Sequence, residues 1–599
     1  MSPMVLENDV EVGESLPPST EHAVSVSLPT WRANVGYEEG EEWVISKMKT
    51  GYPRFFIHKQ IQAFSAAVAD KYGNKGEVAM LFPTNITASR GRDFLLRNVP
   101  DIQVRIVDLI PAAERERSEE LDIISPRISA ILYPAEHFSV AKQYWQHAGE
   151  GVSSRRAEYC FKLFKDELLV ESSELKESKP QSPRVCKGPR RYQKKTSVDF
   201  DSVNRSTTTD GEVQDPASFV EERFGRNLNL TMAKNAKLAI RRRIAGSLTA
   251  DVGLTEALAL DMEQATTRSV PGFSEDDVYL YPTGMSSIFN AHRNIMQAKG
   301  ALKAVVFGFP YIDTLKITEK FGAGSIFYGF GAAEELDDLE RRLEGGERIM
   351  ALFTEFPSNP LLKTPDLERI RSLADKHDFC VVVDESVGNF INVNVLPYAD
   401  VVVSSLTKVF SGDSNVMGGG LILNPKAQNY AKLKKIWNAD YVDNHWAEDS
   451  IFLERNSRDF VSRIQRIGIN AEAICDVLSA HPRVKQVNYP KTSTTRANYE
   501  KCRNPKGNYG GLLSATFYER QDAVAFFDAL DTVKGPSLGT NFTLSSPYVI
   551  LAHYGELDWC ATWGVEADLI RFSVGLEETG KLVETFKRAL EAIPGQDGR

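Results

Sequence analysis

Residues 399–420, ADVVVSSLTKVFSGDSNVMGGG, decide the expected fold of this 599-residue chain. The apolar run 401–403 lacks polar alternation, which is typical of a parallel strand buried on both faces. Lys408 follows at the carboxyl end of this strand, where burial lowers the pKa of an amine and makes it a nucleophile able to form a Schiff base. Ser405 and Thr407 flank it at spacings that could hold a phosphate. The stretch therefore indicates either a pyridoxal 5′-phosphate (PLP) site or a surface lysine that follows a strand.

A second apolar run, residues 379–385 (FCVVVDE), favours the cofactor site. It places an acid, Asp384, at the expected end of another strand. PLP withdraws electrons only while its pyridine nitrogen stays protonated, and a buried carboxylate beside that nitrogen keeps it so. Ligands of doubly wound sheets bind at the carboxyl ends of strands, where Asp384 and Lys408 would both lie. A helix cap is the alternative role for Asp384.

Several phrases of the sequence resemble the Cys/Met-metabolism group of PLP enzymes, which includes cystathionine γ-synthases, cystathionine lyases and O-acetylhomoserine sulfhydrylases. They are VVVDES, SSLTKVFSGDSNVMGG, ERNSRDF (454–460), KGPSLGTNFTLSSPYVILAHYGELDW (534–559) and RFSVGLEE (571–578). The resemblance extends from residue 219 to the C-terminus. It is strongest to the fungal type of cystathionine γ-synthase, which also has a long N-terminal extension. It implies an α/β fold, the aspartate aminotransferase-like fold type I, with a mainly parallel sheet in the large domain and a smaller α/β C-terminal domain.

The same resemblance implies a phosphate cup. In YLYPTGMSSIFNAHRNIMQ (279–297) a strand turns into a helix at Gly284, and free N–H groups at a helix start favour an anion. By resemblance, Gly284 and Met285 would hold the phosphate together with Ser405 and Thr407. Without the resemblance, the pattern predicts only a helix start.

Further site residues are implied in the same way. Tyr311 corresponds to a tyrosine that stacks on the cofactor ring, and it is expected to be catalytic together with Lys408; its alternative is a core tyrosine. Asn359 corresponds to an asparagine that binds the 3-oxygen of the cofactor, in a segment that by itself predicts an Asn-Pro turn. Ser537 would lie beside the lysine and the substrate. Arg571 would bind the substrate α-carboxylate, for which a guanidinium is well shaped, with a structural ion pair as the alternative.

One stretch departs from the family pattern. Members of the family carry Tyr-x-Arg-x-x-Asn-Pro-Thr, which reaches into the phosphate site of the neighbouring subunit. This chain has EERFGRNL at residues 221–228, so Arg223 remains a candidate phosphate contact while the tyrosine is missing. The cross-subunit half of the site is therefore left open.

The composition excludes several classes of protein. A net charge of −10 argues against general nucleic-acid binding. Six scattered cysteines show neither metal-ligand spacing nor a disulfide framework, which indicates a reducing compartment and no metal site. The acidic N-terminus and the lack of a long apolar run argue against a leader peptide or a membrane span. We expect a cytoplasmic enzyme that acts on small amino acids, without nucleic-acid or membrane partners.

Changes in composition along the chain predict five segments. They are a flexible tail (1–28), an α/β extension (29–172), a disordered linker (173–217), the PLP-binding large domain (218–455) and a small domain (456–599). In the extension, FPTNITA (82–88) echoes YPTGMSS (281–287) but lacks its glycine, which indicates a structural copy and not a second site. The role of the extension is not apparent from the sequence.

The resemblance implies γ-replacement, in which L-cysteine displaces the acyl group of O-acetyl- or O-succinyl-L-homoserine and gives L-cystathionine. This reaction belongs to trans-sulfuration and methionine biosynthesis, and the family implies a homodimer or homotetramer. An O-acetylhomoserine sulfhydrylase, a cystathionine lyase or an enzyme of secondary metabolism with another nucleophile would share the cofactor residues, so all three stay open. A catalytically silent scaffold is also open, although the presence of Lys408, Asp384 and Arg571 together argues against it.

Overall fold

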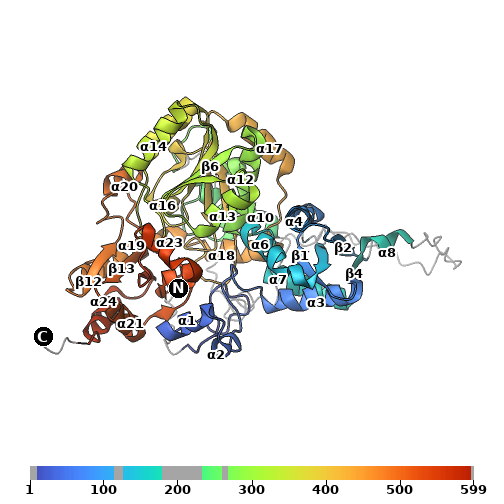
Figure 1. Cartoon of the computed structure of the whole chain (residues 1–599), viewed down its shortest axis with the longest axis horizontal. Coiled ribbons are helices and arrows are strands. Elements are labelled where there is room, and N and C mark those ends of the chain that lie inside the picture. The colour runs from blue at the N-terminus through green and yellow to red at the C-terminus, as the bar shows by residue number, and fades with distance from the viewer. Residues whose placement is uncertain (1–9, 113–123, 125, 178–231, 260–266, 595–599) are drawn as a thin grey trace, which may run out of the picture.

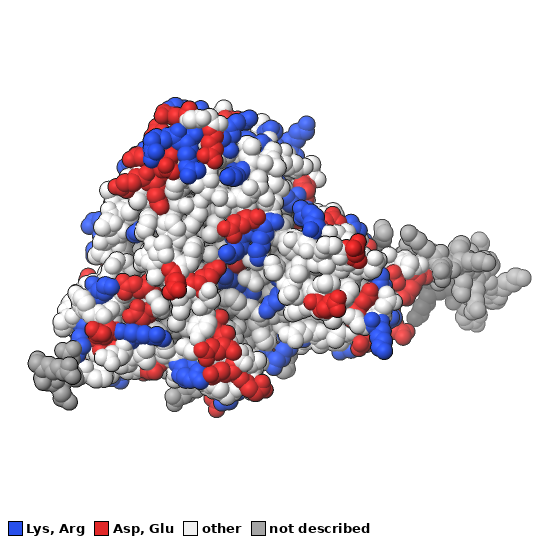
Figure 2. Space-filling model, viewed as in Figure 1, with Lys and Arg blue, Asp and Glu red and all other residues white. Residues whose placement is uncertain are grey.

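A computed structural model describes residues 10–112, 124, 126–177, 232–259 and 267–594. Three β-sheets organise these residues, one each in the N-terminal extension, the large domain and the C-terminal region (Figure 1). No helix in these ranges is both long and apolar enough to cross a membrane. On the face drawn in Figure 2, acidic and basic side chains are interspersed, for example over α14 (Ala333–Glu344), where Asp338 pairs with Arg341 and Arg342.

The largest sheet has seven strands and carries the Lys408 stretch. Its order is β5-β11-β10-β9-β8-β6-β7. Neighbours from β10 to β7 run parallel, whereas β11 is antiparallel to both β10 and β5. The strands are β5 (Val278–Tyr281), β6 (Lys303–Phe307), β7 (Ser325–Tyr328), β8 (Ile349–Glu355), β9 (Cys380–Asp384), β10 (Val401–Ser405) and β11 (Gly419–Leu423). This mainly parallel sheet confirms the predicted α/β class.

Both faces of this sheet are covered, which explains why its strands lack polar alternation. Val401 and Val403 belong to one hydrophobic core, and Val402 belongs to another on the opposite face. The first core includes side chains of α12 (Gly284–Lys299) and α13 (Ile312–Phe321), and the second includes side chains of α10 (Ala233–Ala245) and α15 (Leu367–His377). At the carboxyl edge, Glu355 pairs with Asp384, and Asp384 pairs with Val403, so three strand ends meet.

The C-terminal region forms a five-stranded sheet of order β12-β13-β16-β15-β14. Helices α19 (Phe460–Ser479) and α24 (Thr579–Glu591) lie against each other beside it. The strands are β12 (Val484–Asn488), β13 (Leu512–Phe517), β14 (Val533–Lys534), β15 (Leu544–Pro547) and β16 (Ile570–Ser573). Its apolar side chains join the core on one face of the large sheet, so the two regions pack closely.

The N-terminal extension contains a four-stranded antiparallel sheet of order β1-β3-β2-β4. Its elements are α3 (Lys59–Tyr72), β1 (Glu77–Phe82), α4 (Asn85–Asn98), β2 (Arg105–Pro111), β3 (Ile128–Pro134), α6 (Phe138–Ala148), α7 (Ser154–Lys165) and β4 (Leu169–Glu171). Phe94 and Tyr144 of the extension share one core with Phe289 and Phe321 of the large domain. The extension is thus packed directly on α12 and α13.

The echo between FPTNITA and YPTGMSS has a structural counterpart. In both phrases a strand, β1 or β5, leads through a threonine N-cap into a helix, α4 or α12. Thr84 accepts a hydrogen bond from the N–H of Thr87, and Thr283 accepts one from the N–H of Ser286. The two segments therefore share a strand–cap–helix turn.

Two expectations about flexibility need correction. Residues 10–28, expected to belong to a flexible tail, are packed: Leu16, Val26 and Leu28 have no exposed surface. The N–H of Val24 donates to the carbonyl of Ser414 (2.8 Å), and that of Leu28 donates to the carbonyl of Lys534 (3.0 Å). These backbone bonds supply order that composition does not reveal. The start of the predicted linker forms α8 (Ser172–Glu177), and the remainder lies outside the described residues.

Candidate active site

A cavity lies where the large sheet meets the C-terminal region and the extension. Nine of the residues expected at the site line it: Gly284, Met285, Tyr311, Asn359, Asp384, Ser405, Thr407, Lys408 and Arg571. Ser537 is outside the cavity lining, but its Oγ lies 3.5 Å from Nζ of Lys408, which lines the cavity. Arg223 lies outside the described residues. Residues from positions 284 to 571 thus converge on one space.

Lys408 follows the end of β10, and its side chain is almost fully buried. Its Nζ donates to the hydroxyl of Tyr52 (2.9 Å) and is 3.5 Å from Oγ of Ser537. Behind it, Gly539 has a φ of +70°, and a Cβ there would lie 2.9 Å from Cβ of Lys408. A side chain at position 539 would displace Lys408, so only glycine is compatible with the observed position of the lysine.

Asp384 meets the electrostatic requirement for a pyridinium partner. Burial raises its pKa to about 6, because the hydrogen bonds of Ser386 and the charge of Lys408 offset only part of the loss of water. Its Oδ1 accepts the N–H of Ser386 (2.8 Å). A protonated ring nitrogen in the cavity would supply the missing positive charge, so the residue fits the ring of PLP.

The start of α12 is suited to binding a phosphate. The side chain of Thr283 caps the N–H of Ser286, which leaves the N–H groups of Gly284 and Met285 free for an anion. A Cβ on Gly284 would lie 2.7 Å from Cβ of Ser405, so glycine allows this helix start to approach β10.

Thr407 differs from Ser405 within the cup. The hydroxyl of Thr407 already donates to the carbonyl of Gly418 (3.3 Å) and accepts its N–H (3.1 Å). The hydroxyl of Ser405 lines the cavity with no hydrogen-bond partner among the described residues. Ser405 is therefore the better hydroxyl donor to a phosphate.

Arg571 on β16 is a buried cation without an acidic partner. Its guanidinium donates to the carbonyls of Pro536 (3.0 Å) and Ser537 (2.7 Å) and lies 3.4 Å from Oδ1 of Asn359. Among the described residues no carboxylate pairs with it, and burial lowers its pKa. The structural ion pair considered as an alternative is absent from these contacts, and the charge is available to a carboxylate in the cavity.

Glu355, at the end of β8, accepts hydrogen bonds from the backbone of two other site residues. Its Oε1 accepts the N–H of Tyr311 (2.5 Å), and its Oε2 accepts the N–H of Asn359 (3.1 Å). Burial, with a smaller effect of Asp384, raises the pKa of Glu355 to about 8. The amide of Asn359 donates to the hydroxyl of Tyr548 (3.3 Å).

Tyr52 and Arg54, which come from the extension, were not expected at the site. Burial alone would raise the pKa of Tyr52, but the charge and hydrogen bond of Lys408 lower it below its ordinary value. Arg54 pairs with Asp313 (Nε to Oδ2, 2.9 Å) and lies 5.0 Å from the ring centre of Tyr311. The signal was present in the sequence: Tyr52-Pro53-Arg54 has the Tyr-x-Arg spacing missing from residues 221–228.

Comparison with known proteins bears on the whole chain. Residues 274–591 match the family model of the Cys/Met metabolism PLP-dependent enzymes, and residues 60–153 match that of the fungal trans-sulfuration enzyme N-terminal domain. The chain is 52% identical to a protein of Neurospora crassa named cystathionine gamma-synthase, over 98% of this chain and 99% of that protein. It is 39% identical to a Saccharomyces cerevisiae protein of the same name, over 98% of this chain and 99% of that protein.

A solved structure is similar over a smaller share of the chain. Cystathionine gamma synthase from Xanthomonas oryzae pv. oryzae, in complex with aminoacrylate and cysteine, matches with a TM-score of 0.48 and 22% identity. The match covers 60% of this chain and 98% of that one.

Proposed function

Because this chain belongs to the Cys/Met metabolism PLP-dependent enzyme family, we propose that it replaces the γ-substituent of an O-acyl-L-homoserine with L-cysteine and forms L-cystathionine. The fold is fold type I, and the cofactor is PLP. The observation that carries the choice of reaction is the near full-length similarity to proteins named cystathionine gamma-synthase, extension included.

The residues present are suited to PLP, and we assign them as follows. Lys408 would hold it covalently, Asp384 would contact its ring nitrogen, and Asn359 its 3-oxygen. The ring face would meet Tyr311, and the phosphate would bind Ser405, Thr407 and the N–H groups of Gly284 and Met285. Arg223 remains a candidate phosphate contact on resemblance alone.

PLP supplies an electron-withdrawing ring that accepts the electron pair left when the substrate loses its α-proton. Lys408 Nζ takes this proton and later moves protons at Cα and Cβ, acting as a general base and then as a general acid. Ionised Asp384 keeps the ring nitrogen protonated. Arg571, with Ser537 and Asn359 beside it, holds the α-carboxylate. The net exchange breaks the Cγ–O bond, releases the acyl group as a carboxylate and forms a Cγ–S bond.

The test offers purified protein O-acetyl- or O-succinyl-L-homoserine with cysteine or sulfide, or cystathionine alone, and identifies the products by mass. Cystathionine formed from an acyl-homoserine and cysteine supports the proposal, and the preferred acyl group names the substrate. Turnover with sulfide only would assign a sulfhydrylase, and cleavage of cystathionine only would assign a lyase. No turnover with any of these, in protein that holds PLP, would leave an enzyme with another nucleophile.

We also propose a cytoplasmic location and a homodimeric or homotetrameric assembly. The five cysteines among the described residues are free thiols and buried, which is compatible with a reducing compartment. The assembly rests on the family resemblance, and light scattering of the purified protein tests it.

A further inference from the structure

The segment around Tyr52 enters the cavity from the extension and touches the reacting amine. The ring centre of Tyr52 lies 4.7 Å from Nζ of Lys408, and its hydroxyl accepts the hydrogen bond from that nitrogen. Both residues line the same cavity. Because Lys408 lowers the pKa of this phenol, the pair can hold one proton either as ammonium and phenolate or as amine and phenol, which is the property of a group that assists proton transfer.

Arg54 contacts the part of the cavity wall that carries Tyr311. Its guanidinium donates through Nη2 to Oδ1 of Asp313 (3.2 Å), lies with Nε 2.9 Å from Oδ2, and covers the ring of Tyr311. The Asp313 side chain is 1% exposed and also accepts a hydrogen bond from Gln146 of α6 (3.3 Å). Arg54 therefore ties the wall that carries Tyr311 to the extension.

The segment is held in place by contacts within the same chain. The N–H of Lys49 donates to the carbonyl of Gly13 (2.8 Å), and the hydroxyl of Thr50 donates to the carbonyl of Ala23 (3.0 Å). The next residue, Val24, is bonded to Ser414 in the loop that follows Lys408. Residues 10–28 thus form a layer that connects the Tyr52 segment to the Lys408 loop.

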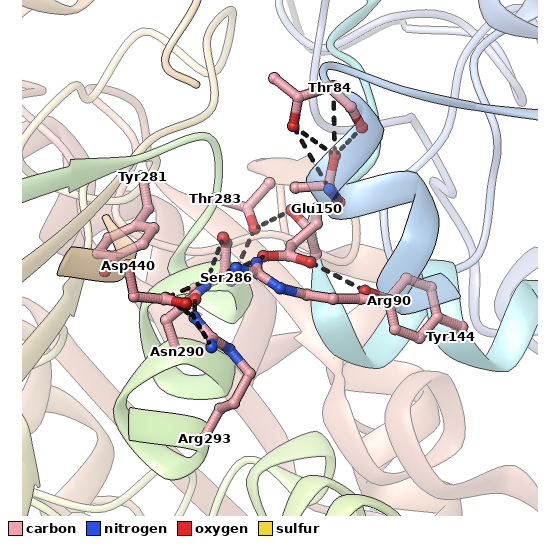
Figure 3. Close-up of polar contacts among 12 residues, drawn as sticks. Thr84, Arg90, Tyr144, Glu150, Tyr281, Thr283, Ser286, Asn290, Arg293 and Asp440 are labelled. Carbon is pink, nitrogen blue, oxygen red and sulfur yellow. Dashed lines mark hydrogen bonds and ion pairs between the residues drawn. The ribbon is translucent and has the colours of Figure 1, made fainter. Parts of the chain in front are cut away.

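The extension also forms a clamp on the start of α12, where the phosphate is expected to bind. Gly149, with a φ of +61°, accepts the hydroxyl proton of Thr283 at its carbonyl (3.0 Å), and Thr283 caps α12. Next to it, the buried carboxylate of Glu150 accepts hydrogen bonds from Arg90 (2.5 Å), from Tyr144 (2.9 Å) and from Asn290 of α12 (3.3 Å) (Figure 3). The cap of α12 and Asn290 within this helix are therefore both bonded to one segment of the extension, Gly149-Glu150.

We propose that the N-terminal extension completes the active site of its own chain, with Tyr52 as a catalytic residue that shares a proton with Lys408 and Arg54 as a positioning residue for Tyr311. Tyr52 reaches the space beside Nζ from its own chain. The inference rests on the proposed function only for its activity assay, because the cofactor itself gives an independent signal.

The first readout is the visible absorbance of PLP joined to Lys408, titrated with pH in full-length holoenzyme. Tyr52→Phe removes a hydrogen-bond partner of the protonated nitrogen and is expected to lower the midpoint by about one pH unit, the size of one charge-assisted bond. Tyr72→Phe, in the same extension but bonded to the exposed Glu174, is the matched control and should titrate as wild type. An unchanged midpoint in Tyr52→Phe would overturn the catalytic assignment.

The second experiment decides which chain supplies Tyr52. Lys408→Ala and Tyr52→Phe chains are co-expressed with different tags, and assemblies that contain both are isolated by two affinity steps. Only the Tyr52→Phe chain can then carry lysine-bound PLP. If the extension serves its own chain, the mixed assembly titrates like Tyr52→Phe and has no more than its activity.

A wild-type midpoint in the mixed assembly, with about half of wild-type activity per dimer, would instead show that Tyr52 comes from the neighbour and would overturn the inference. An active monomer, from which no mixed assembly can be isolated, supports it. Failure of the proposed function has a different outcome: wild type would make no cystathionine, while the absorbance titration would still report on Tyr52.

Discussion

The hydroxyl of Tyr52 lies 2.9 Å from Nζ of Lys408, although 356 positions separate the two residues in the chain. Tyr52 comes just before α3 of the extension, and Lys408 follows β10 of the large sheet. A residue of the extension therefore touches the amine on which the proposed chemistry depends. The extension has to be treated as part of the active site in any mutational work on this protein.

Lys408→Ala is expected to abolish turnover and leave the fold intact. The side chain ends at the cavity, and its loss removes two polar contacts of Nζ without opening a core. Product formation measures the loss of turnover, and the circular dichroism spectrum shows whether the fold is intact. Lys426→Ala, at an exposed position on the same domain, is the control and should keep full activity. Substantial turnover by Lys408→Ala would refute the role of this amine.

Arg571→Lys is expected to raise KM for the acyl-homoserine by at least about tenfold, because a point charge replaces a bidentate donor. Arg571→Ala should raise KM further and yet have only a modest effect on stability, because the removal of a buried cation that no described carboxylate pairs with offsets the loss of its hydrogen bonds to Pro536 and Ser537. Steady-state kinetics and thermal melts of the apo-protein measure the two effects. A large fall in melting temperature with unchanged KM would identify a structural arginine instead.

Asp384 should make PLP binding depend on pH. Its pKa is about 6 in the cofactor-free protein, so it is mostly protonated at pH 5 and mostly ionised at pH 7.5. Only the ionised form attracts a pyridinium, and the affinity of the apo-protein for PLP should therefore rise as pH increases through 6. Titration of PLP into apo-protein at both pH values measures this. Asp384→Asn should bind more weakly at pH 7.5 and lose the difference; a retained difference would assign it to another group.

Glu355 should make the stability of the apo-protein fall with rising pH. Its pKa is raised from 4.5 to about 8 in the folded state, mainly by burial, so the folded protein holds a proton that the unfolded chain releases. The resulting stabilisation is full below pH 4.5 and is lost as pH rises through about 8. Melting temperatures between pH 5 and pH 8.5 should decrease accordingly.

The decrease should be smaller in Glu355→Gln, which cannot titrate, although the loss of one backbone acceptor costs it about 1–3 kcal/mol at low pH. Glu334→Gln, at an exposed position on α14, should follow the wild-type curve. Parallel curves for Glu355→Gln and wild type would remove Glu355 as the cause.

Gly149→Ala tests the clamp on α12. A Cβ at Gly149 would lie 2.7 Å from Cβ of Met285 and would overlap Oγ1 of Thr283, in addition to the strain of φ +61°. We expect a loss of about 1–3 kcal/mol in stability and weaker PLP binding. Gly40→Ala is a matched control, because Gly40 has φ +69° with nothing within 4 Å of the added Cβ. Equal effects of the two substitutions on PLP binding would contradict the clamp.

Residue patterns alone located the carboxyl edge of the large sheet. Asp384 and Lys408 could be placed together because each ends an apolar strand, and parallel strands bring their ends to one edge. Tyr52 could not be found in that way, because its position depends on a layer of backbone bonds between segments far apart in sequence. Residues 10–28 were expected to be flexible for the same reason: their few apolar side chains are buried against partners distant in sequence, Val26 and Leu28 beside Val44 and Met48, and Leu16 beside the C-terminal region. The hydrogen bonds between the hydroxyl of Thr407 and the backbone of Gly418 could not be predicted either, because they depend on how the chain folds back into β11.

The Val24–Ser414 bond and the Gly149–Thr283 bond have a practical consequence for protein production. The family model of the Cys/Met metabolism PLP-dependent enzymes matches residues 274–591, and trimming to that portion would be a natural choice for a shorter recombinant fragment. Such a fragment would expose the aromatic side chains of α12 and α13 to water and would leave the lysine without its phenol. A low yield or an inactive product from it would then reflect where the gene was cut, and not the catalytic ability of the enzyme.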